Sequence, residues 1–367
     1  INNKTEYLIV APAEFGSLAS ELAKFRSGGS AVAPFPTTLV LVEDIYRYYK
    51  GGSLSPVAIR NYLAYAKNIC PNLKYVLLVG YGHFDYRGFN PKFPKNFIPP
   101  YEREAVVSED FYGVLDSGQV AVYGNDDIDL AVGRLTIVNE TEFRSYLKKI
   151  KEYEQVGLYD HSDWRSTLVM TADDARNGSD LDKTEHTRMH EGVGSMIDSM
   201  SVEMKYRWKQ NKIYLLNYKE DAAGQKKGAA QDLVDALNRG ALMTTYFGHA
   251  SVTDWAGEGL LKTSYVTRLS NKKRYTILNS FSCSTSRFDN GKTMSLTHSF
   301  VLTPDVGAIA AIGATRETFA SQNELFAKKF IATALFEPGA TIGDALLTSK
   351  NQEVKSDTFS FRFNTGH

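Results

Sequence analysis

His249 and Cys283 are the two residues whose types and positions could together perform covalent chemistry. Each ends an apolar run, ALMTTYFGH or YTILNSFSC, with the length and composition of a buried strand. A cysteine attacks as its thiolate, and a neighbouring imidazole can take the thiol proton and later return it to a leaving group. The pair therefore predicts Cys283 as a nucleophile, with His249 as its partner in proton transfer.

The spacing of these two residues fits neighbouring parallel strands. They lie 34 positions apart (283 − 249), and the segment between the two runs is long enough for the crossover that parallel strands require. Strands paired in a sheet are about 4.8 Å apart, so the two side chains would face one another at its carboxyl edge. Open α/β sheets bind their ligands at that edge.

A structural role is the alternative for both residues, because most free cysteines are small core residues. Three features favour catalysis: Gly248 before the histidine, the hydroxyl-rich run Ser284–Ser286 after the cysteine, and the apolar strands that precede both. The second cysteine, Cys70, precedes Pro71 at the end of a predicted helix, where we expect a structural role. A disulfide between Cys70 and Cys283 would abolish the nucleophile.

The histidine segment resembles that of the gingipain-like cysteine peptidases. The family motif is close to Y-x-G-H-G-S with a Trp six places after the His, and the segment here reads YFGHASVTDW, with Trp255 and with Ala250 in place of Gly. The resemblance implies that the N–H groups of Ala250 and Cys283 hold the oxyanion, provided position 250 needs no positive φ. Gly248 and Ser284 flank the same site as candidate binding residues. Trp255 either lines the substrate pocket or belongs to the core.

Other segments are more similar to the type IX secretion system sortases, which are the C-terminal signal peptidases of this family, than to the secreted gingipains. These segments extend over nearly the whole chain. They read SCSTSRFDN, YVLLVGYGHFDYRG, SEDFYGVLD, DIDLAVGR and TADDARN. The resemblance implies a transpeptidase that removes the C-terminal signal domain of secreted cargo and attaches the cargo to a surface glycolipid such as anionic lipopolysaccharide. It also implies other secretion components as partners, export to the cell surface or outer membrane of a Gram-negative bacterium, and further N- and C-terminal domains. A gingipain-type endopeptidase and a non-catalytic scaffold remain the alternatives.

An acidic pair, Asp173-Asp174, follows the apolar run STLVMT. In the resembling family an acidic residue after the corresponding strand supports the catalytic histidine. Aligning Thr171-Ala172-Asp173 onto that motif makes Asp173 the counterpart and Asp174 the second choice. A carboxylate that accepts the imidazole N–H would fix the tautomer of His249 and stabilise its charged form. A solvated loop pair is the alternative.

Other residue sets fit a metal or nucleotide site poorly. His186 and His190 have the i, i+4 spacing of zinc ligands, but H-E-x-x-H requires Glu where Thr187 stands, so we expect no zinc and a solvated face for both histidines. The segment GYGHFDYRG does not match a phosphate-binding loop and predicts a loop at the sheet's carboxyl edge. We therefore expect no metal or cofactor to be required for the chemistry. Structural calcium is a secondary reading of the turn at Asp126, Asp127 and Asp129, which lacks a full set of alternating oxygen ligands.

The composition limits the partners. The 42 basic residues balance 42 acidic ones, so the charge gives no reason to expect nucleic acid or an anionic membrane surface as a partner. No apolar run approaches the ~20 residues of a membrane helix, so we do not expect a transmembrane protein. Ile1 opens the chain without a signal peptide, which is compatible with a mature or excised piece of an exported protein.

The order of apolar runs predicts an α/β protein, and the resemblance implies that its fold is caspase-like (gingipain-like). Two similar halves, residues 1–157 and the catalytic 158–367, each have a mainly parallel sheet flanked by helices. Predicted strands lie at 7–11, 38–42, 75–79, 129–132, 166–171, 213–216, 241–248, 275–283 and 307–313. Predicted helices lie at 14–25, 56–66, 141–153, 184–197, 229–237, 324–335 and 342–350.

Overall fold

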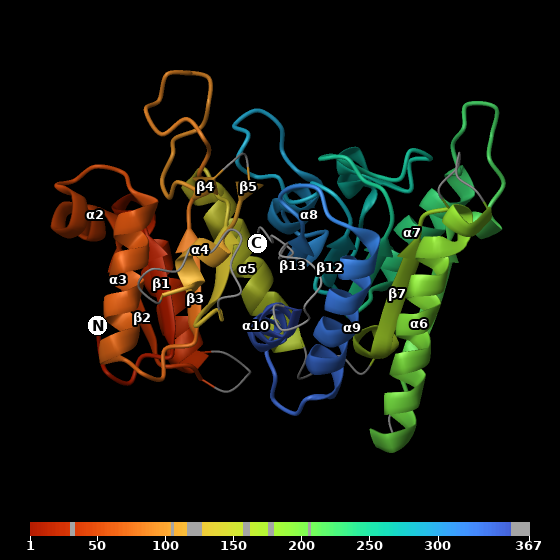
Figure 1. Ribbon diagram of the computed structural model, residues 1–367, viewed down its shortest axis with the longest axis horizontal. Coiled ribbons are helices and arrows are strands. Elements are labelled where there is room, and N and C mark those ends of the chain that lie inside the picture. The colour runs from red at the N-terminus through yellow and green to blue at the C-terminus, as the bar shows by residue number, and fades with distance from the viewer. Residues whose placement is uncertain are drawn as a thin grey trace. The chain divides into compact units, whose positions relative to one another are not determined.

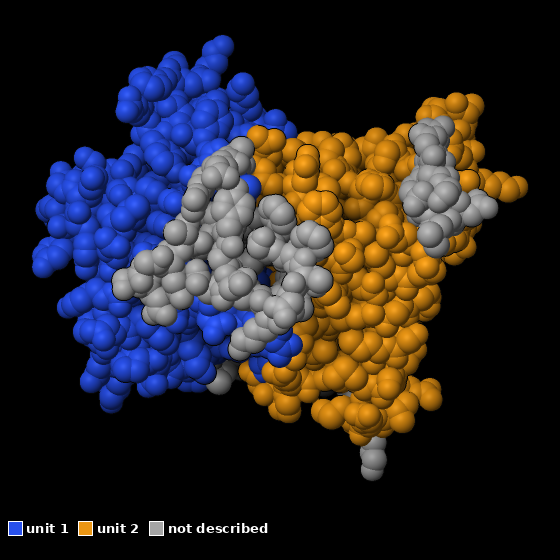
Figure 2. All heavy atoms as spheres, viewed as in Figure 1, with its two compact units in different colours: residues 1–158, 288–293, 340–367 blue, residues 159–287, 294–339 orange. Residues whose placement is uncertain are grey.

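The computed structural model describes residues 1–29, 34–103, 106–115, 127–156, 162–174, 180–204 and 207–353, and the chain divides into two compact units. Unit 1 comprises residues 1–158, 288–293 and 340–367, and unit 2 comprises 159–287 and 294–339 (Figure 2). The sequence predicts a single boundary after residue 157. In the structure two later segments belong to unit 1 as well, because the Tyr75 hydroxyl donates to Asp344 at 2.8 Å and the Arg134 guanidinium lies 4.8 Å from the centre of the Phe288 ring.

Unit 1 contains a four-stranded parallel sheet with the order β2-β1-β3-β6. Its helix α3 shows how local sequence sets an element: the Ser55 hydroxyl accepts from the Ala58 N–H at 3.2 Å, and Pro56 occupies the first helical position. The strands are β1 (Tyr7–Ala11), β2 (Thr37–Leu41), β3 (Tyr75–Val79) and β6 (Ala131–Leu135), with a small pair β4 (Glu102–Arg103) and β5 (Val106–Val107). The helices are η1 (Ala13–Phe15), α1 (Gly16–Lys24), η2 (Phe25–Gly29), α2 (Val42–Lys50), α3 (Pro56–Ile69), α4 (Asp110–Gly113), α5 (Glu140–Val156) and α10 (Ile342–Glu353).

Unit 2 contains a five-stranded parallel sheet with the order β13-β12-β9-β7-β8. Every residue of its three central strands is buried, which explains their nearly continuous apolar runs. The strands are β7 (Thr167–Ala172), β8 (Lys209–Tyr214), β9 (Met243–Phe247), β12 (Thr276–Phe281) and β13 (Ala308–Gly313), with a small pair β10 (Asp254–Trp255) and β11 (Leu261–Lys262). The helices are η3 (Asp163–Ser166), α6 (Asp180–Met204), η4 (Leu215–Asn217), α7 (Lys227–Arg239), η5 (Thr263–Arg268), α8 (Leu296–Leu302) and α9 (Ala320–Phe336).

The crossovers of unit 2 reverse direction between β7 and β9. The chain moves from β7 to β8 on one side, then returns to β9, β12 and β13 on the other. Right-handed crossovers therefore place α6 on one face of the sheet and α7 and α8 on the other, and α9 packs beside α6 (Figure 1). Ligand sites of open α/β sheets lie at such a reversal, outside the carboxyl ends of the strands. In unit 2 that position is the carboxyl end of β7 and β9.

These observations confirm the α/β fold with two mainly parallel sheets flanked by helices. The predicted parallel pairing of the two runs that carry His249 and Cys283 is confirmed as well, with Phe247 of β9 opposite Phe281 of β12. No helix in the described part of the chain is both long and apolar enough to span a membrane.

Candidate active site

The strand register brings the three predicted chemical residues to one edge of unit 2. Phe247 is opposite Phe281 on one side and Ala172 on the other. His249 and Cys283 each lie two residues beyond these paired positions (249 − 247 and 283 − 281), and Asp173 lies one residue beyond Ala172. The Asp173 N–H donates to the Phe247 carbonyl at 2.9 Å, so the strand ends stay joined where the candidate site begins.

Cys283 is a half-buried free thiol on a loop held against the end of β13. Its Sγ–H is 3.7 Å from the carbonyl oxygen of Thr318, and the next N–H, of Ser284, donates to the Arg316 carbonyl at 2.9 Å. Ser284 has φ +56°, a left-handed conformation that costs a residue with a side chain about 1–2 kcal/mol. The strain lies directly beside the predicted nucleophile.

The hydroxyl groups around Cys283 form a buried structural network. Ser280 Oγ accepts from the Trp255 indole N–H at 2.8 Å and from the Thr285 hydroxyl at 2.9 Å. A hydroxyl has one donor and two acceptor positions, so Ser280 must donate its own hydrogen to Ser282 Oγ, 2.7 Å away. The hydroxyl-rich sequence that favoured catalysis therefore also has a structural purpose, which is to fix the Cys283 loop to the core.

Hydrogen bonds hold the main chain of His249 on both sides. Its N–H donates to Asp173 Oδ2 at 3.0 Å, and its carbonyl accepts from the Tyr246 hydroxyl at 2.6 Å and the Ala256 N–H at 3.0 Å. Burial, reinforced by the Asp173 charge, raises the pKa of Tyr246 well above its usual value, so the phenol stays protonated and can donate. The His249 residue itself is exposed. The structure thus fixes the peptide and presents the ring to solvent.

Gly248 is required by the close approach of its neighbours. A Cβ at this position would lie 2.3 Å from Tyr246 Oη and 2.4 Å from Asp173 Cβ, both far inside contact distance. The glycine before the histidine therefore allows Asp173 to reach the His249 N–H, which is a packing role rather than direct contact with a substrate.

Asp173 contacts a different atom of His249 from the one predicted. The sequence predicts a bond to the ring N–H, whereas the bond in the structure goes to the main-chain N–H, and the other carboxylate oxygen accepts from the Asp174 N–H at 2.9 Å. A bond to the ring stays a prediction. Asp174, the second choice, instead pairs with Lys226, whose ammonium also donates to the Leu215 carbonyl at 2.8 Å.

A buried acidic cluster lies beneath His249, in which one oxygen from each of Asp173, Asp174 and Glu258 falls within 4.8 Å of the others. Burial, and then the two aspartates, raise the pKa of Glu258. The Lys226 ammonium already supplies a cation to this cluster. The predicted calcium site at Asp126, Asp127 and Asp129 is a separate one. Asp126 lies outside the described residues, and Asp129 Oδ2 accepts a hydrogen bond from the Leu115 N–H at 3.0 Å. Calcium binding at this turn stays a prediction.

The two main-chain groups proposed for the oxyanion are free to bind one. Within the described residues, neither the Ala250 N–H nor the Cys283 N–H donates a hydrogen bond. Ala250 does not have a positive φ, so alanine fits this position without strain. Trp255 is 0 % exposed and stacks on Tyr246 with ring centres 4.5 Å apart, which is the core alternative for this residue.

Two histidines on α6 are buried, and their predicted place on a solvated face is wrong. His186 is 6 % exposed and His190 is 0 % exposed. The His186 ring lies 5.2 Å from the His249 ring at 85°, a neighbour that the sequence did not identify. Helical spacing to the buried Val193 and Ile197 was the available signal, because positions 186, 190, 193 and 197 share one helix face.

Cys70 is also buried and free, and its Sγ–H donates to the Asn2 carbonyl at 3.0 Å, which agrees with a structural role.

Comparisons with known proteins agree with this architecture. The family model for peptidase family C25 matches residues 1–365. The crystal structure of the Arg-specific cysteine proteinase gingipain R (RgpB) aligns with a TM-score of 0.70 and 15 % identity over 100 % of this chain and 79 % of that chain. A complex of the RgpB pro- and mature domains from Porphyromonas gingivalis aligns with a TM-score of 0.70 and 15 % identity over 98 % and 78 %. Dimeric latent PorU from the same organism aligns at 22 % identity over 41 % of this chain and 16 % of that chain, with a TM-score of 0.34 that is too low to support structural arguments. No curated protein sequence matches the chain significantly.

The gingipain-like fold and the family match together define a cysteine peptidase. The chain belongs to peptidase family C25, the gingipain family. The predicted family and its gingipain-like fold are therefore confirmed. The individual roles of Cys283, His249 and Asp173 stay predictions.

Proposed function

We propose that this cysteine peptidase is a sortase of the type IX secretion system. It would remove the C-terminal signal domain of secreted cargo and join the new carboxyl end to an amine on a surface glycolipid. One observation supports the proposed chemistry. His249 and Cys283 each lie two residues beyond the paired Phe247 and Phe281, at the carboxyl edge of the sheet in which the strand order reverses. The sortase assignment rests on the sequence segments 282–290, 75–88, 108–116, 127–134 and 171–177.

In the first step the Cys283 thiol transfers its proton to His249, and the sulfur attacks the carbonyl carbon of the scissile peptide. The oxyanion that forms accepts hydrogen bonds from the unoccupied N–H groups of Ala250 and Cys283. His249 then gives its proton to the leaving amine, the C–N bond breaks, and the cargo remains on Cys283 as a thioester.

The second step decides the class of enzyme. An amine that attacks the thioester forms a new amide and regenerates the thiol, which is transpeptidation. Water at the same carbon gives hydrolysis. A gingipain-type endopeptidase is the second candidate, and the fold likeness to gingipain R supports it. For the sortase, the expected partners are cargo proteins, other secretion components and a glycolipid acceptor at the cell surface.

The test is mass spectrometry of cargo cut in the presence of a simple amine such as a glycine peptide. We expect cleavage before the C-terminal signal domain and incorporation of the amine at the new carboxyl end. Short Arg or Lys peptides should turn over slowly, because a sortase must keep water from the thioester until the correct partners bind.

Three outcomes separate the candidates. Efficient hydrolysis of short basic peptides with no amine incorporated would make the endopeptidase the better assignment. No cleavage of either substrate by the folded full-length protein would favour a scaffold. The control is Cys283→Ala, which should abolish product in both assays while leaving the protein folded.

A further inference from the structure

The two buried histidines of α6 lie four residues apart and differ in what they contact. The His190 ring packs on Phe247 with centres 5.0 Å apart, and its Nδ1–H donates to the Thr171 carbonyl at 3.0 Å. The His186 ring packs on His249, with centres 5.2 Å apart and planes at 85°. Within the described residues, the buried Nδ1 of His186 has no hydrogen-bond partner, and the same holds for Nε2 of His190. His190 thus supports the core of the sheet, whereas His186 contacts the ring assigned to proton transfer.

The bonds to the main chain of His249 do not orient its ring, so a contact to the ring itself is required for that. Its peptide is fixed by Asp173 and Tyr246, but these bonds leave the side-chain torsions free. Among the described residues, no hydrogen bond reaches the His249 ring, and its ring contact is with His186. Edge-to-face packing of two rings raises the population of the packed orientation by about twofold to tenfold relative to the others.

We propose that His186 is a positioning residue, whose buried ring holds the His249 imidazole in its reactive orientation while Asp173 fixes the His249 main chain. The sequence assigns the orientation of the His249 ring to Asp173 and makes no prediction for the main chain. In the structure Asp173 bonds the His249 main chain, and the contact with the His249 ring comes from His186. This inference rests on the proposed role of His249 in the cysteine peptidase reaction.

The charges around His186 are consistent with a neutral ring. The groups that act on it are Asp173 at the end of β7, His249 beyond β9, and Glu185 on its own helix. Burial lowers the pKa of His186, Asp173 and Glu185 oppose this shift, and His249 lowers the pKa further. A neutral neighbour permits His249 to carry the positive charge that it acquires from the Cys283 thiol, whereas a charged neighbour would repel it.

The test compares variants that keep volume but differ in the ring. His186→Phe keeps an edge-to-face contact, His186→Leu removes it, and His190→Leu is the matched control on the same helix. The readout is covalent labelling of Cys283 by a peptidyl acyloxymethyl ketone, resolved into kinact and KI. We expect His186→Leu to lower kinact by up to about tenfold with KI within about twofold, and His186→Phe to recover most of the loss. His190→Leu should lower the urea midpoint of unfolding at least as much as His186→Leu, with kinact within about twofold of the unchanged protein.

The outcomes distinguish this inference from the proposed function. Loss of Cys283 labelling in the unchanged protein overturns the proposed function and the inference with it. Normal labelling of the unchanged protein, with equal kinact values for His186→Leu and His190→Leu, overturns the inference alone. If His186→Leu fails to fold, a kinact for His186→Phe that is depressed more than about tenfold would equally refute a role based on ring packing.

Discussion

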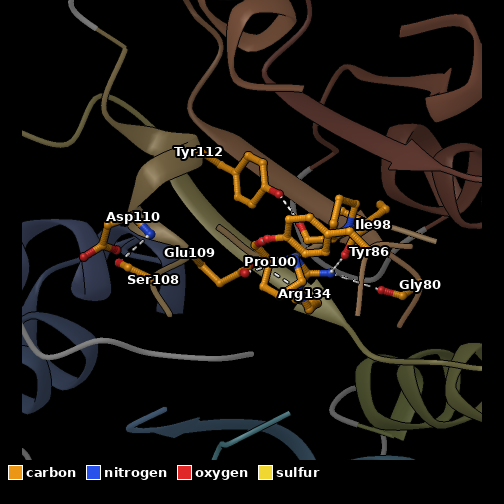
Figure 3. Close-up of polar contacts among 10 residues, drawn as sticks. Gly80, Tyr86, Ile98, Pro100, Ser108, Glu109, Asp110, Tyr112 and Arg134 are labelled. Atoms are coloured by element: carbon orange, nitrogen blue, oxygen red, sulfur yellow. Dashed lines mark hydrogen bonds and ion pairs between the residues drawn. The ribbon is translucent and has the colours of Figure 1, made fainter. Parts of the chain in front are cut away.

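The carboxyl edges of the two parallel sheets are built in opposite ways. In unit 1, Arg134 of β6 is 0 % exposed at its side chain and forms a two-pronged ion pair with Glu109, whose side chain is 2 % exposed. The same guanidinium donates to the carbonyls of Ile98 at 2.8 Å and Gly80 at 3.2 Å (Figure 3). Tyr112 and Tyr86 donate to the next two carbonyls, of Pro99 and Pro100. These bonds close the edge of unit 1.

The segment of residues 97–100, which contains three of these carbonyls, also fills the position in unit 1 where open α/β sheets bind their ligands. The strand order of unit 1 reverses between β1 and β3, and the rings of Phe15 and Phe97 meet there with centres 4.8 Å apart. A Cβ on Gly82 would lie 1.9 Å from the Ile98 carbonyl oxygen. The glycines after β3 therefore admit the protein's own chain at this edge.

The corresponding edge of unit 2 keeps polar groups free. The N–H groups of Ala250 and Cys283 have no partner among the described residues, His249 is exposed, and Ser284 is strained. Paired buried charges stabilise one arrangement, whereas unoccupied N–H donors beside a half-buried thiol can bind the carbonyl group of a substrate. The two edges thus share one architecture but differ in how their polar groups are paired, and four predictions test this difference.

The largest effect is expected at the reactive edge. Cys283→Ala should lower peptide cleavage by roughly 10³-fold or more, because the covalent step is lost, and should abolish labelling by a thiol-directed acyloxymethyl ketone. Cys70→Ala is the control: this thiol is 0 % exposed and bonded to a carbonyl, so labelling should be unchanged. Labelling of Cys283→Ala at Cys70 would refute the assignment.

At the closed edge, Arg134→Met should lower the free energy of unfolding by about 3–5 kcal/mol, because Glu109 is left buried and unpaired. Urea denaturation measures the change. The double variant Arg134→Met with Glu109→Met should recover part of it, since no charge then remains. The exposed pair of Arg47 and Asp44, with side chains 75 % and 59 % exposed, is the control, and Arg47→Ala should cost less than about 1 kcal/mol. Equal losses for the two arginines would contradict a structural edge.

Acid should weaken the protein through buried neutral histidines. Burial lowers the pKa of His190 to about 3 and that of His298 to about 4. Below about pH 6.5 the unfolded chain binds these protons while the folded chain does not, so stability falls as pH falls from 6.5 toward those values. At pH 5 each histidine should cost about 2 kcal/mol relative to pH 7.5. Urea unfolding at both pH values should show a smaller difference in His190→Gln and in His298→Gln, and an unchanged difference would refute the explanation.

The smallest effects concern backbone conformation beside the site. Ala250→Gly, which restores the family residue, should lower stability by about 0.4–1 kcal/mol, because Ala250 has no positive φ and glycine only adds freedom to the unfolded chain. Ser284→Gly should raise stability by up to about 1 kcal/mol by relieving φ +56°. Thermal unfolding should therefore shift in opposite directions, and shifts of the same sign would show that the strain is misassigned.

The sequence predicts the strands of both sheets well, because buried parallel strands appear as short apolar runs. It also predicts that His249, Cys283 and Asp173 follow such runs, and the register brings them to one edge. The strands and the residues that follow them can be predicted from the order of elements along the chain, without knowledge of contacts between distant side chains.

What the sequence does not predict depends on atoms that meet only in the folded chain. The position of Asp173 can be read from an alignment, but its bond to the main chain of His249 depends on the close approach at Gly248. The contact of His186 with His249 depends on which face α6 turns to the sheet. The pairing of Arg134 with Glu109 joins positions far apart in sequence that share no motif.

The membership of residues 288–293 in unit 1 has a consequence for how the protein folds. Phe288 lies against Arg134, the Asp289 carbonyl accepts from the Phe84 N–H at 3.2 Å, and the Gly291 N–H donates to the Tyr81 hydroxyl at 3.2 Å. The chain thus leaves unit 2 five residues after Cys283 (288 − 283) and re-enters it at Met294. No single cut of the polypeptide therefore yields either unit whole, and a fragment that ends at residue 156 lacks the later segments of unit 1, so we expect it to unfold at a lower urea concentration than the full chain.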